Sequence, residues 1–245
     1  GNYTISANTT LLPNEIDPNN NAFEDGNVTV VGPPEWYIAE IAITNITPSK
    51  TKVAKGDTVD IDVTVWNNGN STETFDLKAY ANTTIIQTKV VSLLNQTSET
   101  ITLTWNTTGV LPGNLTISAH VNILPREINP YDNTRIDGTV EVVPRDVAIT
   151  DVTPFKTVVG KGYSVSINIT VENQGHFSET FNVTAYYHTT PFNTTEITSL
   201  SSGNSTTITI TWNTMGVVYG NYTITAKAAP LPYETDITDN TRIGA

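Results

Sequence analysis

The chemistry that this sequence offers most often is that of the Asn-x-Ser/Thr tripeptide, the acceptor of N-linked sugars in secreted chains. The asparagine and Ser/Thr contents give roughly six or seven such tripeptides by chance. The sequence holds 14, about twice that number, and we therefore expect glycosylation rather than a by-product of composition. The acceptors are Asn2, Asn8, Asn27, Asn45, Asn70, Asn82, Asn95, Asn106, Asn114, Asn168, Asn182, Asn193, Asn204 and Asn221.

A second set of candidate ligands lies in an acidic turn at 127–137, where carboxylates alternate with amides. Related turns occupy 15–25 and 234–240. Hard cations such as Ca²⁺ take about six to eight oxygen ligands, and such a turn supplies several. The spacing does not fit an EF-hand, so a loop shaped by its Asn, Asp and Pro residues is the alternative. The predicted Ca²⁺ ligands are Glu127, Asn129, Asp132 and Asp137, and we expect no other cofactor.

The sequence gives little support to catalysis. His120, His176 and His188 share no spacing, and the sequence has no nucleophile elbow, metalloprotease helix or phosphate loop. There are no cysteines, which excludes disulfides and thiolate chemistry. We therefore predict that the protein is not an enzyme.

Charge and hydropathy narrow the range of partners. A net charge of −12 and a pI near 4.5 argue against nucleic acid, which requires a basic surface. No apolar run approaches the ~20 residues of a membrane span. The chain starts without Met or a signal peptide, so we expect a processed product or an excerpt of a longer protein.

The elements that must position these residues are repeated along the chain. The stretch Gly113–Val143 shares 17 of 31 residues with Gly1–Val31 and returns in Gly220–Ala245. The repeat is about 107 residues long, which is the size of a domain rather than of a solenoid turn. We predict a partial repeat of two closing strands at 1–31, followed by domains at 36–143 and 146–245.

Each repeat has a hydrophobic period of two. Val59, Ile61, Val63 and Val65 alternate with Thr and Asp, and the second copy repeats this pattern. Successive strand side chains point to opposite faces, so one face is apolar and the other is wet. With about seven short strands per ~100 residues, the sequence predicts an all-β fold of tandem Ig-like antiparallel β-sandwiches.

The alternation also assigns the tryptophans and several glycan acceptors. Trp105 and Trp212 are expected in the cores, whereas Trp66 falls on an outer face, where it stacks on sugar, packs at an interface or is covered by a loop. The acceptors that it places outward are Asn106, Asn114, Asn168, Asn182 and Asn221.

Two motifs connect the sequence to a known family. The step Val65-Trp66-Asn67-Asn68-Gly69 and the closing turn Glu127…Asp132-Asn133 resemble those of CARDB domains, the adhesion-related Ig-like modules of secreted archaeal surface proteins. The resemblance covers essentially the whole chain and rests on structural motifs. It implies an extracellular or cell-surface, tandemly repeated, non-catalytic module, and it carries over no active site.

These observations favour a structural segment of an extracellular glycosylated filament, stalk or coat, whose partners are copies of itself or neighbouring repeats. An adhesin or carbohydrate-binding module of a larger secreted protein is the alternative. The second full repeat has no counterpart of Thr139–Val143, whereas the partial repeat carries a similar strand at Asn27, Val28, Thr29, Val30 and Val31. Either missing sequence completes both ends, or the strand of one molecule completes the next, as in donor-strand complementation.

Overall fold

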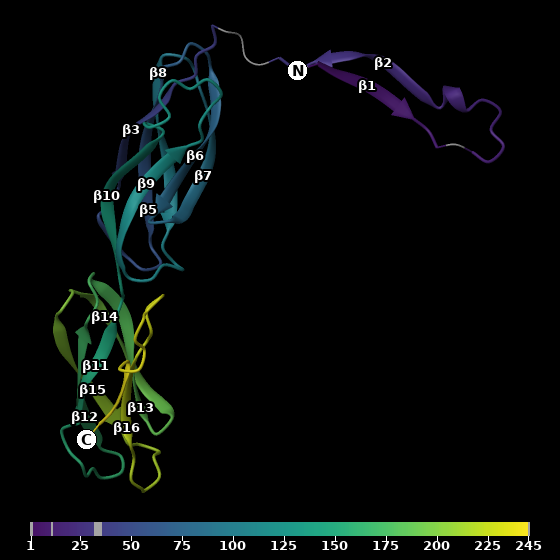
Figure 1. The fold of residues 1–245 in the computed structure, drawn as a ribbon. Coiled ribbons are helices and arrows are strands. Elements are labelled where there is room, and N and C mark those ends of the chain that lie inside the picture. Colours follow the sequence, from purple (N-terminus) through teal and green to yellow (C-terminus); the bar gives the residue numbers. More distant parts are fainter. Residues whose placement is uncertain (1, 11, 32–35, 245) are drawn as a thin grey trace.

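The computed structural model describes residues 2–10, 12–31 and 36–244, which form a hairpin followed by two β-sandwiches (Figure 1). The elements of the hairpin are β1 (Asn2–Asn8), the short 3-10 helix η1 (Pro18–Asn20) and β2 (Ala22–Thr29). The two strands are antiparallel, and Figure 1 shows them apart from both sandwiches. The described part of the chain contains no α-helix, and hence no helix that could span a membrane.

The first sandwich has two sheets, ordered β3-β5-β8 and β4-β10-β9-β6-β7. Its strands are β3 (Ile41–Pro48), β4 (Lys52–Ala54), β5 (Thr58–Asn67), β6 (Glu73–Ala81), β7 (Thr84–Leu93), β8 (Thr97–Asn106), β9 (Gly113–Val121) and β10 (Thr134–Val143). One pairing corrects the antiparallel prediction, because β4 runs parallel to β10. Since β4 has only three residues, it is too short to carry a recognisable alternating pattern.

The second sandwich has the sheets β11-β12-β15 and β14-β13-β16-β17. Its strands are β11 (Val147–Pro154), β12 (Ser164–Asn173), β13 (Glu179–Tyr187), β14 (Thr190–Leu200), β15 (Ser205–Asn213), β16 (Ile224–Ala228) and β17 (Thr241–Ile243). The two sandwiches lie end to end, with the hairpin beyond the first and the C-terminus at the far end of the second (Figure 1).

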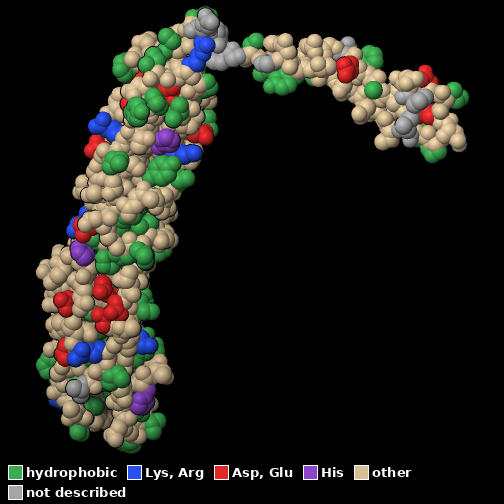
Figure 2. All heavy atoms as spheres, viewed as in Figure 1, with side chains coloured by type: hydrophobic (Ala, Val, Ile, Leu, Met, Phe, Trp, Pro, Cys, Tyr) green, Lys and Arg blue, Asp and Glu red, His purple; other side chains and the backbone are tan. Residues whose placement is uncertain are grey.

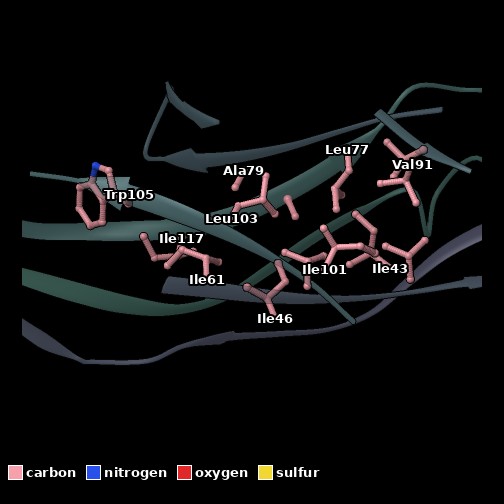
Figure 3. Close-up of a cluster of buried hydrophobic side chains, with 14 of the residues drawn as sticks. Ile43, Ile46, Ile61, Leu77, Ala79, Val91, Ile101, Leu103, Trp105 and Ile117 are labelled. Carbon is pink, nitrogen blue, oxygen red and sulfur yellow. The ribbon is translucent and has the colours of Figure 1, made fainter. Parts of the chain in front are cut away.

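The cores follow the alternation of the sequence. Val59, Ile61, Val63 and Val65 of β5 are fully buried and point into the layer between the sheets. Figure 3 shows Trp105 at one end of this layer, with Ile61 and Ile117 nearby. The β-branched residues suit such a surface because they pack well on a pleated sheet. The tandem Ig-like β-sandwich prediction is therefore confirmed.

Burial also confirms the assignment of the tryptophans. Trp105 is 5% exposed and Trp212 is 6% exposed, whereas Trp66 on the outer face of β5 is 38% exposed. Asn168 lies at an outward position of β12, as alternation predicts, between the buried Ile167 and Ile169. It is half-exposed because β12 is the central strand of its sheet, and it accepts a hydrogen bond from the hydroxyl of Thr209 on the neighbouring β15.

Candidate functional site

The glutamates of the acidic turns accept hydrogen bonds from the backbone. Glu127 accepts from the N–H of Ile41 at 3.2 Å and from the N–H of Leu124 at 2.7 Å. Glu234 accepts from Val147 at 2.8 Å and from Leu231 at 2.8 Å in the second sandwich. Each carboxylate therefore fixes its turn to the first strand of its own sandwich.

The other predicted Ca²⁺ ligands also have protein partners. The Asn129 amide donates to Asp132 at 2.9 Å, and Asp137 lies 3.5 Å from Arg135. Across residues 2–10, 12–31 and 36–244, no three His, Cys, Asp or Glu side chains are grouped so as to hold a metal ion. Ca²⁺ binding remains a prediction, and the geometry supports the alternative of a structural loop.

The acidic turn of the second sandwich also carries electrostatic strain. Burial, followed by the charges of Asp239, Glu234 and Asp236, raises the pKa of Asp146 to about 6. Oδ1 of Asp146 and Oδ1 of Asp239 are buried, and neither has a hydrogen-bond partner among the described residues. Figure 2 shows acidic side chains gathered on the half of this sandwich nearer the first. The ionised form of Asp146 therefore opposes folding at neutral pH.

The asparagine of the Val-x-Asn-x-Gly step holds a turn in both sandwiches. The buried Asn67 amide donates to the carbonyls of Ser71 and Leu93, both at 2.9 Å, and its oxygen accepts from the N–H of Gly69. Asn173 makes the equivalent three bonds in the second sandwich. The motif is thus structural, because a buried amide must satisfy both its donors and its acceptor.

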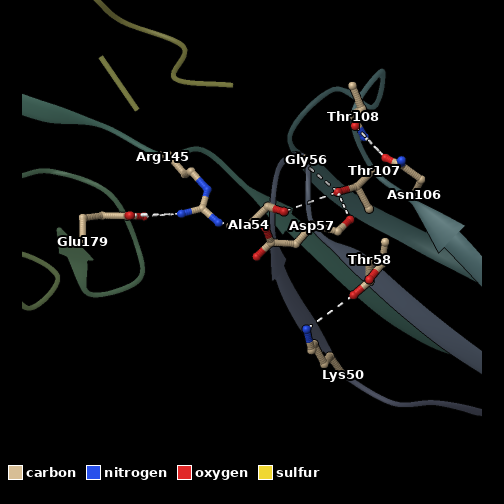
Figure 4. Close-up of polar contacts among 10 residues, drawn as sticks. All are labelled: Lys50, Ala54, Gly56, Asp57, Thr58, Asn106, Thr107, Thr108, Arg145 and Glu179. Carbon is tan, nitrogen blue, oxygen red and sulfur yellow. Dashed lines mark hydrogen bonds and ion pairs between the residues drawn. The ribbon is translucent and has the colours of Figure 1, made fainter. Parts of the chain in front are cut away.

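Arg145 joins the two sandwiches. Its guanidinium lies 2.8 Å from Asp57 of the first sandwich and 2.8 Å from Glu179 of the second (Figure 4). Burial raises the pKa of Glu179, and the charge of Arg145 partly offsets this shift. In the first sandwich the equivalent Glu73 instead accepts from the Tyr37 hydroxyl at 2.8 Å, and burial together with Glu73 raises the pKa of Tyr37 to about 12.

A second contact fixes the same joint. Tyr233, directly before the acidic turn of the second sandwich, lies against Gly56 of the first, so closely that an added Cβ would overlap the ring. Gly56 also has φ +92°, which favours glycine. A charged joint and an aromatic contact therefore connect the two domains end to end.

The far end of the second sandwich is open. A cavity of about 520 Å³ lies there between the segments 156–161 and 217–224. Its apolar floor is Val165, Trp212 and Ile224. In the first sandwich the equivalent place is filled by Val140 and Val142 of β10, which are at most 1% exposed.

Three aromatic side chains, Trp212, Tyr219 and Tyr222, line this cavity, and Tyr187 contacts Trp212. Tyr187 stacks on Trp212 with ring centroids 5.1 Å apart, and Tyr222 meets Trp212 edge-on at 5.5 Å. Tyr219 lines the cavity and is 84% exposed, with the ammonium of Lys161 over its ring at 5.4 Å. The cavity thus combines aromatic faces with a buried Trp212 Nε1 that has no hydrogen-bond partner among the described residues.

The glycan acceptors are distributed over both sandwiches and the hairpin. Of the 14 sequon asparagines, 13 are exposed and Asn168 is half-exposed. At Asn70 the acceptor nitrogen donates to the carbonyl of Trp36, so a sugar there would replace that bond. None of the 14 side chains is buried, as attachment of a glycan requires.

The family assignment follows from these repeated turns and cores. The CARDB sequence profile matches residues 39–123 and 145–242, which cover most of both sandwiches but leave out β10. The chain belongs to the CARDB family. CARDB domains are non-catalytic Ig-like modules typical of secreted or surface proteins, and this chain is a surface- or adhesion-related module of that type.

Several solved structures are similar to parts of this CARDB chain at low identity and low TM-score. One is a CARDB domain from Pyrococcus furiosus in complex with di-metal ions: identity is 22%, coverage is 45% of this chain and 97% of that chain, and the TM-score is 0.36. Another is the D0-D1 domain of intimin, at 18% identity, covering 83% and 97%, with a TM-score of 0.30. Calcium binding domain CBD12 of CALX1.1 matches at 10% identity, covering 76% and 79%, with a TM-score of 0.27. None of the curated protein sequences matches the chain.

Proposed function

We propose that this CARDB chain is a structural segment of an extracellular glycosylated filament, stalk or surface coat. The observation that carries the proposal is the joint, where the largely buried guanidinium of Arg145 bridges Asp57 and Glu179. Because the joint uses opposite ends of the two sandwiches, further repeats or copies extend the array in one direction. Such a head-to-tail contact does not close on itself and produces a fibre.

The surface supports the same function. Fourteen acceptors with accessible side chains allow a sugar coat around each bead, and the net charge of −12 keeps neighbouring arrays apart. Intact mass spectrometry with glycopeptide mapping of the native protein tests the coat. We expect glycopeptides with sugars on several of the acceptors; bare asparagines at all of them refute the coat.

A second candidate function is carbohydrate binding, which the aromatic cavity favours. Exposed Tyr219 and the edge of Tyr222 offer apolar faces of the kind that stack on sugar rings. A glycan array probed with the chain and with Tyr219→Ala separates the two functions. Specific binding that Tyr219→Ala abolishes supports an adhesin, whereas absence of binding leaves the structural role.

A further inference from the structure

The cavity of the second sandwich has the geometry of a strand site, as the first sandwich shows. There the second half of β10 lies between β9 and β4, with Val140 opposite Leu115 and Glu141 opposite Asn114. On the other side the N–H of Glu141 donates to the carbonyl of Thr51 at 2.8 Å. The strand thus completes hydrogen bonds on both edges and fills the core between them.

The second sandwich has the same two edges facing the cavity. Residues 220–223 take the place of the start of β9, and 157–161 take the place of β4. Within the described ranges, no strand pairs with either segment across the cavity. As a result Val159 is half-exposed, whereas Val53 at the equivalent position is 1% exposed.

We propose that Asn27–Val31 of a second copy enters this cavity as a strand in the register of β10. The inference rests on the proposed head-to-tail function and names the segment that makes the contact. In this register Val28 lies opposite Tyr222, Thr29 lies opposite Asn221 and Val30 lies opposite Gly220. The hairpin and the cavity lie at opposite ends of the molecule (Figure 1), so each copy joins the next.

The donor segment has the sequence and backbone of the strand that it replaces. Gly26–Val31 reads GNVTVV, and Gly138–Val143 reads GTVEVV. The leading glycines share a left-handed conformation, with φ +74° at Gly26 and φ +80° at Gly138. The three valines of Gly26–Val31 are 51%, 57% and 78% exposed, whereas those of Gly138–Val143 are at most 2% exposed. Apolar side chains patterned for a core are therefore presented at the surface.

Charge at the edge selects this donor. In the first sandwich Glu141 of β10 forms an ion pair with Lys52 of β4 at 2.8 Å. In the proposed contact Thr29 takes the place of Glu141 and Val158 takes the place of Lys52, so both partners are uncharged. A strand with Glu at this position would find a valine in place of Lys52 and lose a half-exposed ion pair, which favours Thr29 modestly.

Strand donation requires a small rearrangement of the hairpin. Asn27, Val28 and Thr29 now pair with the first residues of β1, and these pairs must separate before the strand enters the cavity. New ladders with 220–223 and 157–161 replace the lost backbone bonds. Asn27 takes the place of Thr139, which is exposed, so a glycan on Asn27 remains outside the core.

Disulfide cross-linking tests the register, since the chain has no cysteine of its own. Directly opposite strand residues have Cβ atoms about 4.5–5.5 Å apart, close enough for a disulfide after a small shift. Full-length Thr29→Cys and Asn221→Cys chains, made without glycans, are mixed and oxidised. The matched control pairs Val28→Cys with Asn221→Cys, because neighbouring side chains of a strand face opposite sides.

We expect several-fold more covalent heterodimer from Thr29→Cys with Asn221→Cys than from the control pair. Excess peptide of residues 24–31 should abolish this product, and the same peptide carrying Thr29→Glu should need a higher concentration to do so. Equal yields from both pairs, or no heterodimer from folded chains, overturn the inference. If residues that follow Ala245 in a longer polypeptide fill the cavity, no heterodimer forms, and this result also overturns the inference. Filaments of native material that lack this contact would refute strand donation and leave the proposed function intact.

Discussion

Replacing Trp105 by Ala should remove a large part of the stability of the first sandwich. The side chain is 5% exposed, so nearly the whole indole, on the order of 200 Å², leaves water on folding. Truncation of such a residue costs about 3–5 kcal/mol, from lost burial and from the cavity left behind. That is a large share of the roughly 5–15 kcal/mol that stabilises a domain.

Trp66 provides the matched control within the same sandwich. It lies on β5 and is 38% exposed on the outer face. Trp66→Ala should therefore cost about 1 kcal/mol, the typical effect of a point mutation. Urea unfolding followed by far-UV circular dichroism measures both losses, and the transition of the second sandwich serves as an internal reference. Small and equal losses for Trp105→Ala and Trp66→Ala would refute the assignment of the strand faces.

Three further predictions follow from the joint, the acidic turn and the acceptors. Arg145→Met should cost the second sandwich about 3–5 kcal/mol in urea unfolding, because it leaves Glu179 buried without a counter-charge; Asp57→Asn, at the exposed partner, should cost under about 1 kcal/mol. Equal costs would contradict this, and adding Glu179→Gln to Arg145→Met should restore much of the loss. The pKa of Asp146 is raised from 3.8 to about 6 on folding, so the folded state binds more protons between these values and the melting temperature should fall as pH rises through this range. Asp146→Asn should make this slope shallower, with the pKa shifts of Glu179 and Asp239 supplying the remainder, and an unchanged slope would refute it. Glycopeptide mapping of native protein should find sugars on acceptors of both sandwiches, and bare asparagines throughout would overturn the predicted coat.

The sequence predicted the sandwiches well because alternation is a local signal. Val59 and its neighbours on β5 carry apolar residues at every second position, and burial follows directly from the pleat. The inward Trp105 and the outward Trp66 follow from the same parity. Asn168 obeys the same parity, but its exposure is reduced by a neighbour on β15, a strand remote in sequence.

The joint was not predicted from the sequence. Arg145 lies between the predicted domains 36–143 and 146–245, but its partners Asp57 and Glu179 lie 88 and 34 residues away. Only the folded ends of two domains bring these charges together. A signal was present in the repeat, since Glu73 and Glu179 occupy equivalent core-edge positions that each require a donor. The aromatic residues that gather around Trp212 at the cavity were not predicted either, because only the folded chain brings them together.

Electron microscopy of native material tests the central claim most directly. If this CARDB chain is a segment of a head-to-tail array, the micrographs should show thin fibres or stalks made of sandwich-sized beads in single file. Antibody raised against the second sandwich should decorate them at a regular spacing along their length. Dispersed particles without fibres, stalks or coat, decorated singly by the antibody, would contradict the account.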